Sequence, residues 1–233
     1  MSTDVESVNQ DQENSTAEES IQNQARSRTQ IRRIPKNART EKEFLYQVID
    51  SAYVCHVAFQ DEHGIHCIPT ACWREHDHLY IHGANASRMM KQLQKGIQAC
   101  VTITHIDGIV LARAAFNHSM NYRSAMIYGS FEVVPSEQKA ASLAHFLESL
   151  VPGRQAQVRA GNFAELAGTT VLRIALDETM CKTRSGGPND DDEDIDLPVW
   201  AGVLPLQLNK GEPVLDPSSK VQTAAHVDAW LAS

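Results

Sequence analysis

The sequence contains no Cys-x-x-Cys pair, no excess of positive charge and no apolar run near the ~20 residues of a membrane span. Its 21 Lys and Arg against 29 Asp and Glu give a net charge of −8, which argues against nucleic-acid or membrane-surface partners. The five scattered cysteines indicate reduced thiols rather than a zinc site. Because the first twenty residues lack the apolar core of a signal peptide, we expect a cytoplasmic protein.

The chain has enough apolar residues, 42% of 233, to build a sizeable core. Residues 1–30 are rich in Gln, Ser, Asn and Glu and hold almost no large apolar side chains. Such a segment buries too little surface to offset its chain entropy, so we predict a disordered N-terminal tail. At the other end, residues 218–233 can form an amphipathic helix.

Between these tails, short β-rich runs are separated by Asp and Gly turn signals, which is typical of an antiparallel meander. An Asp-Gly turn at 107–108 is expected to separate two strands. The strand that carries Arg123 is expected to begin at Tyr122, and Lys182 is expected to follow a strand. The expected strands cover 53–60, 65–73, 78–83, 97–104, 109–116, 122–134, 169–176 and 199–208.

A few helices interrupt these strands. A capping box of Thr40 and Glu43 predicts a helix over 40–50, and Ser136 is expected to cap another that ends at the Pro-Gly pair 152–153. Shorter helices are expected over 86–96 and 162–168. This order lacks the alternation of a parallel sheet, and it predicts a mainly β, α+β fold, an antiparallel barrel with peripheral helices.

The segment from His82 to Lys91 is the first candidate site. A strand ends there, and a helix opens with Ser87 and Arg88, followed one turn later by Lys91. A helix N-terminus with a hydroxyl and two cations could hold a phosphate group. The alternative is a plain turn followed by a solvated helix face.

Two other segments could border a ligand. Pro69 lies inside a strand-like run, and because proline cannot donate to a ladder it marks a strand edge. That edge could face a flat ligand, or it could serve only to prevent aggregation. The polar stretch His118–Ser124 could be an ordinary loop or one wall of an anion site that uses Arg123.

Other chemistries find little support in the sequence. The histidines could hold a metal or a haem, but their spacing places several of them in solvent. The acidic run 189–194 lacks the ligand spacing of an EF-hand and is expected to be a solvated loop. No nucleophile elbow, P-loop or dinucleotide fingerprint occurs, so no catalytic side chain is assigned.

Six motifs nevertheless occur in a familiar order. They are IPTACW (68–73), LYIHGANASRMMK (79–91), FNHSMNYRSAMIYGSFEVV (116–134), LVPGR (150–154), MCKTRSGGP (180–188) and DLPVWAGVLPL (196–206). Over residues 31–208 this order resembles the pyridoxamine 5'-phosphate oxidase-like FMN-binding split-barrel family, in particular its flavin-nucleotide-binding, nitroimidazole-resistance-protein-like branch.

The resemblance implies a split β-barrel domain over 31–208, followed by an extension over 209–233. It further implies a homodimer with FMN in clefts at the subunit interface. A lysine directly after the Ser-Arg pair of the related oxidase is replaced here by Met89, and that oxidase's pyridoxal-phosphate residues are not recognisable. The residues implied to contact FMN are Pro69, Thr70, Ala71, His82, Gly83, Ser87, Arg88, Lys91, Asn121, Tyr122, Arg123, Ser124, Lys182 and Trp200.

These expectations combine into an FMN-dependent oxidoreductase acting on a small aromatic, nitro or related substrate. The flavin would supply the redox chemistry, which accounts for the missing catalytic triad. The alternative is a non-catalytic flavin or haem carrier or sensor of the same fold, with His82 or His118 on the haem iron. A domain that has lost its ligand is a third hypothesis.

Overall fold

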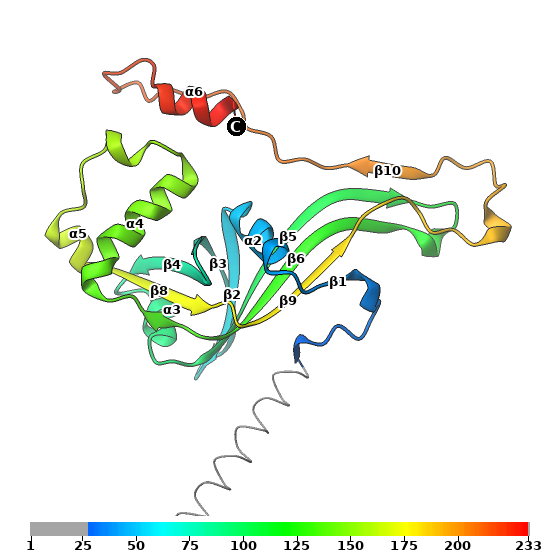
Figure 1. Ribbon diagram of the computed structural model, residues 1–233, viewed down its shortest axis with the longest axis horizontal. Coiled ribbons are helices and arrows are strands. Elements are labelled where there is room, and N and C mark those ends of the chain that lie inside the picture. Colours follow the sequence, from blue (N-terminus) through cyan, green and yellow to red (C-terminus); the bar gives the residue numbers. More distant parts are fainter. Residues whose placement is uncertain (1–27, 233) are drawn as a thin grey trace, which may run out of the picture.

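The fold is a curled antiparallel sheet that closes partway into a barrel and carries helices on its outside (Figure 1). The computed structural model describes residues 28–232. Its strands pair in the order β1-β9-β6-β5-β2-β3-β4-β8-β7, and β10 pairs with β5. The strands are β1 (Ala38–Arg39), β2 (Val54–Asp61), β3 (Gly64–Glu75), β4 (His78–Ala84), β5 (Gln98–Leu111), β6 (Ser119–Ser130), β7 (Glu132–Val133), β8 (Thr169–Ala175), β9 (Glu178–Arg184) and β10 (Gly202–Pro205). The α-helices are α2 (Lys42–Asp50), α3 (Arg88–Leu93), α4 (Ser136–Leu150), α5 (Phe163–Ala167) and α6 (Ala225–Ala232).

The barrel core follows from the two-residue period of its strands. In β2, Cys55, Val57 and Phe59 are buried, whereas the residues between them lie on the outer face. Leu79 and Ile81 of β4 enter the same core. This alternation is what a strand with one buried face requires. The expected mainly β, α+β split barrel is confirmed.

Strand β3 joins the two halves of the barrel. Its first part, residues 64–71, pairs with β2, and its last part, residues 72–75, pairs with β4. No strand of the described chain pairs with the other side of residues 64–71. Pro69 therefore lies on a sheet edge, as its missing N–H predicts.

Helix α4 covers the outer face of the other half of the barrel. A second apolar cluster forms there from Trp73, Tyr80, Val134 and Val171, with Phe146 of α4 packed against it. The Trp73 and Phe146 rings lie 4.8 Å apart, as in a packed aromatic pair. Because α4 covers the outer face of this half of the barrel, that face is not open to a ligand.

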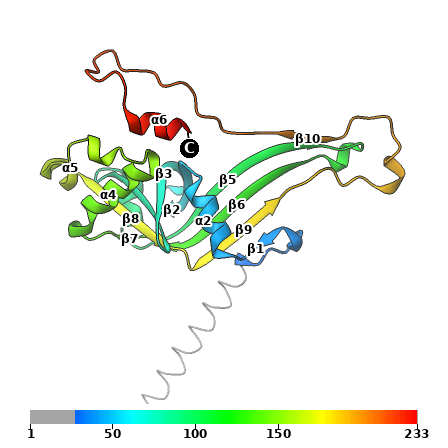
Figure 2. The ribbon, with the colours of Figure 1, turned by 45° about the horizontal axis from the view of Figure 1, so that its top comes forward.

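At the opposite end, β5, β6 and β9 extend away from the helices as a long arm, with β10 beside it (Figure 2). The expected turn at 107–108 is wrong. β5 continues through it, and the register with β6 shifts between Ile106 and Gly108, as at a β-bulge. Asp-Gly suits a bulge as well as a turn, and only the long partner strand β6 decides between them.

Gly108 has a specific steric reason to lack a side chain. A Cβ placed there would lie 3.0 Å from both the Leu204 carbonyl oxygen and a methyl group of Val203, on the paired strand β10. We expect Gly108→Ala to loosen β10 by ~1–3 kcal/mol, measured as faster hydrogen exchange of the Val203 and Leu204 amides. The matched control is Gly187→Ala, where an added Cβ has no atom within 4 Å; equal exchange in both variants would contradict the steric explanation.

Two strand boundaries differ from those expected. β6 begins at Ser119 rather than Tyr122, and Lys182 lies within β9 rather than after a strand. In the arm, strands are exposed on one face, so polar residues alternate with apolar ones. For this reason the polar part of each strand resembles a loop in the sequence.

The predicted helix caps also differ. Glu41, not Thr40, is the N-cap of α2 and makes no side-chain capping bond; the Thr40 N–H instead donates to the Glu41 carboxylate at 3.0 Å. Ser136 is the first residue of α4 rather than its cap. The expected capping in these helices is thus wrong, although both helices are present.

The chain ends pack onto the domain where the structure describes them. Residues 1–27 of the predicted tail lie outside the described residues. Arg28 pairs with Glu178 and lies over the Tyr128 ring, so residue 28 contacts the barrel. The C-terminal helix expected over 218–233 is present only over Ala225–Ala232, as α6, and none of its residues is buried. Within residues 28–232, no helix is long and apolar enough to span a membrane.

Candidate functional site

Arg88 stands at the open end of the barrel, on the first residue of α3. Met90 and Leu93 of α3 are fully buried in the core, which fixes this short helix in place. Arg88 itself is exposed, and its Nη2 donates to His66 Nδ1 at 3.3 Å. Within the described chain, Arg88 forms no ion pair with a carboxylate. Its guanidinium is exposed to solvent and acts on Asp61 only through space, where it helps to lower the pKa of that carboxyl.

Of the other residues predicted to hold a phosphate at this helix, Ser87 lies beside Arg88 and Lys91 does not. Ser87 occupies the N-cap of α3 but makes no side-chain capping bond. Lys91 lines a separate cavity of about 380 Å³ with Ser136 and Lys139. Since α3 has only six residues, its dipole adds little, and the site depends on side chains.

His82 and Gly83 point to opposite faces of β4. The His82 ring lies beneath α4, 4.9 Å from the Phe146 ring, and burial lowers its pKa. Its Nδ1 is buried and has no hydrogen-bond partner in the described structure. Gly83 faces inward, where an added Cβ would lie 3.0 Å from Met90. The pair therefore cannot bind a phosphate together through side chains.

The edge of β3 offers one flat surface, on the face opposite to that of His66. Pro69 and Ala71 lie on its outer face with the exposed Cys67, whereas Thr70 lies opposite Cys55 on the inner side. Among the three predicted ring contacts, only Pro69 and Ala71 present side chains outward. Thr70 could reach an outer ligand only through its backbone.

The stretch from Asn121 to Ser124 also divides between two faces. Tyr122 and Ser124 lie opposite Arg184 and Lys182 on one face, while Asn121 and Arg123 point to the other. Asn121 is almost fully buried, where its amide donates to the Gly186 carbonyl and accepts from Arg184. Through these two hydrogen bonds the Asn121 side chain stabilises the end of β9.

Arg123 already has an anionic partner in its own chain. Its Nη2 and Nε donate to the Asp107 carboxylate at 2.9 and 3.1 Å, and this contact raises the pKa of Arg123. The pair borders a cavity of about 590 Å³ that also includes Tyr53, His105 and Leu208. Asp107 therefore balances the guanidinium charge of Arg123.

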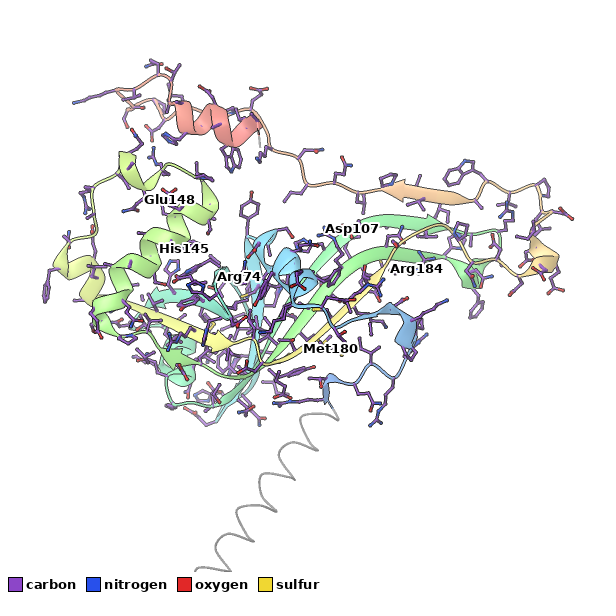
Figure 3. All side chains as sticks on the ribbon, in the orientation of Figure 1. Arg74, Asp107, His145, Glu148, Met180 and Arg184 are labelled. Carbon is purple, nitrogen blue, oxygen red and sulfur yellow. The ribbon has the colours of Figure 1, made fainter. Side chains whose placement is uncertain are left out.

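Lys182 and Trp200 lie well away from Arg88. The Lys182 ammonium donates to the Arg33 carbonyl, and Trp200 stands just before β10, 62% exposed. Ala99, near the Arg88 end, and Leu111, near Trp200, are twelve residues apart on β5, roughly 40 Å along the strand. Figure 3 shows Arg184, on the arm, far from His145 of α4 at the helical end. One flavin cannot contact both Arg88 and Trp200 of the same chain.

The sequence analysis missed two residues of this site, Asp61 and His66. His66 was only one of many histidines, and Asp61 belonged to a turn. The signal available was their spacing across the β2–β3 hairpin, which places both on the inner side of its end. Within residues 28–232, no three His, Cys, Asp or Glu side chains form a potential metal site.

Comparisons with known proteins agree with this fold. The family model of pyridoxamine 5'-phosphate oxidase matches residues 41–183. No curated protein matches the sequence. A solved protein from Bacteroides thetaiotaomicron, assigned to 5-nitroimidazole antibiotic resistance, is 22% identical over 62% of this chain and 85% of its own, with a TM-score of 0.53. That last likeness concerns the fold alone.

Two solved structures are more similar. The flavocytochrome Anf3 from Azotobacter vinelandii is 33% identical, with a TM-score of 0.83 over 87% of this chain and 95% of its own. The FAD and heme binding protein from Mycobacterium smegmatis is 34% identical, with a TM-score of 0.80 over 83% and 96%. With the split barrel and the family match, these similarities show that the chain belongs to the pyridoxamine 5'-phosphate oxidase family of flavin-binding split-barrel proteins.

Proposed function

We propose that this protein binds FMN, with Arg88 as the phosphate anchor, and exchanges electrons with small molecules. The observation that carries the proposal is the exposed Arg88 guanidinium, which has an imidazole neighbour but no carboxylate partner in the described chain. A phosphate is the ligand such a group favours, because it offers a charge-assisted and bidentate contact. When bound, the flavin would supply the electron or hydride transfer.

The chain's own residues would hold and orient the cofactor. Pro69 and Ala71, on the free edge of β3, would lie against the flat ring, and Thr70 would offer backbone groups to its polar edge. Ser87 would add a hydroxyl near the phosphate. Lys91 would contribute long-range positive charge rather than a direct contact, because it lines a different cavity.

A homodimer would complete the site. The outer sheet face exposes Val54, Ile65, Ile106 and Met120, apolar side chains that a second copy would cover. Because Trp200 lies too far from Arg88 within one chain, a second copy would have to bring Trp200 and the 121–124 segment to the flavin. The active form would then carry two equivalent sites.

Cofactor content tests the proposal directly. The full-length protein, purified and denatured, is expected to release FMN in about one equivalent per chain, identified by chromatography and mass. Release of FAD instead of FMN would leave the proposed flavin function intact and change only the identity of the nucleotide, as the name of the mycobacterial relative suggests. A colourless protein that takes up neither FMN nor FAD would overturn the proposal.

A second candidate function adds haem to the flavin. Two relatives are named as a flavocytochrome and as a FAD and heme binding protein. In this chain, His118 Nδ1 donates to the Ala114 carbonyl at 3.1 Å, which leaves Nε2 as the atom able to ligate iron. Iron-bound histidines commonly show this arrangement. Phe116 and Met120 beside it are exposed and could contact a porphyrin.

His118→Ala tests this second function. If haem is bound, the variant is expected to lose the Soret band, because the iron loses its axial nitrogen, while flavin absorbance stays unchanged. His63→Ala, which removes an exposed histidine, serves as the control. A Soret band that persists in His118→Ala and disappears in His82→Ala would assign the ligand to His82 instead.

A further inference from the structure

Asp61, His66 and Arg88 form a chain of hydrogen bonds at the open end of the barrel. Asp61 ends β2, His66 lies near the start of β3, and Arg88 begins α3. His66 Nε2 lies 2.8 Å from Asp61 Oδ1, and His66 Nδ1 lies 3.3 Å from Arg88 Nη2. The imidazole also packs on the Phe59 ring, with the centroids 5.1 Å apart. Three separate elements thus meet at one imidazole ring.

The two partners determine which ring nitrogen of His66 carries the proton. The Asp61 carboxylate can only accept, so Nε2 must donate; the Arg88 guanidinium can only donate, so Nδ1 must accept. The Asp61 side chain is fully buried and also accepts the His63 N–H at 2.8 Å. The hydrogen bond from His66 lowers the pKa of Asp61. These contacts fix the orientation of the imidazole ring and match its Nε2–H tautomer.

A neutral acceptor holds Arg88 differently from a carboxylate. Asp107 balances the charge of Arg123 directly, whereas His66 takes one N–H of Arg88, and the Asp61 carboxylate acts on Arg88 only from beyond the imidazole. A free arginine loses much side-chain entropy when it binds an anion, and prior fixation reduces that loss. Within the described residues, Arg88 is thus one of several arginines, with Arg154 and Arg184, that are held by neutral acceptors and form no ion pair.

We propose that His66, oriented by Asp61, is a positioning residue that aims Arg88 at the phosphate of the bound flavin nucleotide. This inference rests on the proposed function, because it needs a flavin phosphate at Arg88. His66 acts through Arg88 and does not itself touch the reacting ring. Loss of His66 therefore weakens phosphate recognition and leaves recognition of the ring unchanged.

The test compares FMN with riboflavin, which has the same ring but no phosphate. Dissociation constants of both are measured by flavin fluorescence on the full-length, cofactor-stripped protein. His66→Ala is expected to weaken FMN binding roughly 2- to 10-fold, as for one lost hydrogen bond, with riboflavin binding unchanged. His66→Gln is expected to restore much of the FMN preference, because an amide can donate to Asp61 and accept from Arg88.

Further variants separate positioning from a structural role. His63→Ala, in the same hairpin, keeps the backbone N–H that reaches Asp61 and should bind FMN like the wild type. In the Arg88→Ala background, adding His66→Ala should cause no further loss, since both residues act on one contact. Long-range ¹⁵N–¹H correlation spectra should show the Nε2–H tautomer of His66 in the wild type.

The outcomes distinguish the two proposals. A wild-type protein that binds neither FMN nor riboflavin overturns the proposed function and this inference with it. Normal flavin binding with an unchanged FMN-to-riboflavin ratio in His66→Ala overturns the inference alone. Equal losses of FMN and riboflavin in His66→Ala would show a structural role, and additive losses in the double variant would place His66 on a contact separate from Arg88.

Discussion

Arg88→Ala is expected to weaken FMN binding by ~1–3 kcal/mol, or roughly 5- to 150-fold, because it removes a charge-assisted hydrogen bond to the phosphate. The side chain is exposed and the core contacts of α3 come from Met90 and Leu93, so the fold should persist. Titration of the cofactor-stripped variant with FMN, alongside riboflavin, measures the effect. Riboflavin affinity should stay at its wild-type value.

The matched control removes a different exposed arginine. Arg159 forms an ion pair with Glu165 of α5. Arg159→Ala changes the net charge by the same amount as Arg88→Ala. FMN affinity in this control should equal that of the wild type. An Arg88→Ala protein with wild-type FMN affinity would remove Arg88 from the phosphate site and place the anchor elsewhere.

Ile81→Ala should lower the free energy of unfolding by ~2–5 kcal/mol. Ile81 is fully buried in the barrel core, on a strand whose neighbours β3 and β8 leave little freedom to collapse into the space. The loss combines the transfer free energy of the removed atoms with the cavity left behind. Urea denaturation of the cofactor-free protein, with an unchanged m-value, measures it.

Ile65→Ala provides the control for that measurement. Ile65 has the same side chain, also lies in a strand, and is 81% exposed. Its replacement should change the free energy of unfolding by no more than ~0.5 kcal/mol. If the two variants were equally stable, β4 could not lie at the centre of the barrel core.

The central strands could be predicted because their environment is uniform. Val57 lies between two neighbouring strands, and one face of β2 meets the core along its length, so the two-residue period is visible. In β4, Leu79, Tyr80 and Ile81 are all buried, and the strand reads as a continuous apolar run. In the arm the same rule weakens. There, β9 and the first part of β6 carry polar residues that are mostly half-buried, and their sequences resemble loops.

The bulge at 107–108 shows a different limit. Asp-Gly is compatible with a hairpin turn and with a bulge, since both accept the same residue types. The choice depends on Ser119–Ser130, which pairs with β5 on both sides of the irregularity. A local pattern contains no information about that partner.

The candidate site, too, could be predicted from the sequence only in part. Arg88 could be proposed from its place after a strand and at the start of a helix. The neutral partner that distinguishes it from Arg123 could not, because the contact with His66 joins residues 22 positions apart in sequence. Likewise, the pairing of Arg123 with Asp107 depends on the bulge, which places the two side chains together.

The sequence by itself determined the fold class, the family and the position of one phosphate-binding candidate, because strand periodicity, turn residues and motif order are local properties of the chain. Tertiary structure alone decided which cationic side chains form a direct ion pair with a carboxylate, and which predicted site residues share a face. Side chains alternate along a strand, so neighbours such as His82 and Gly83 separate on folding. Distant residues such as Asp61, His66 and Arg88 meet for the complementary reason, since the curled sheet brings a hairpin and a helix to the same rim.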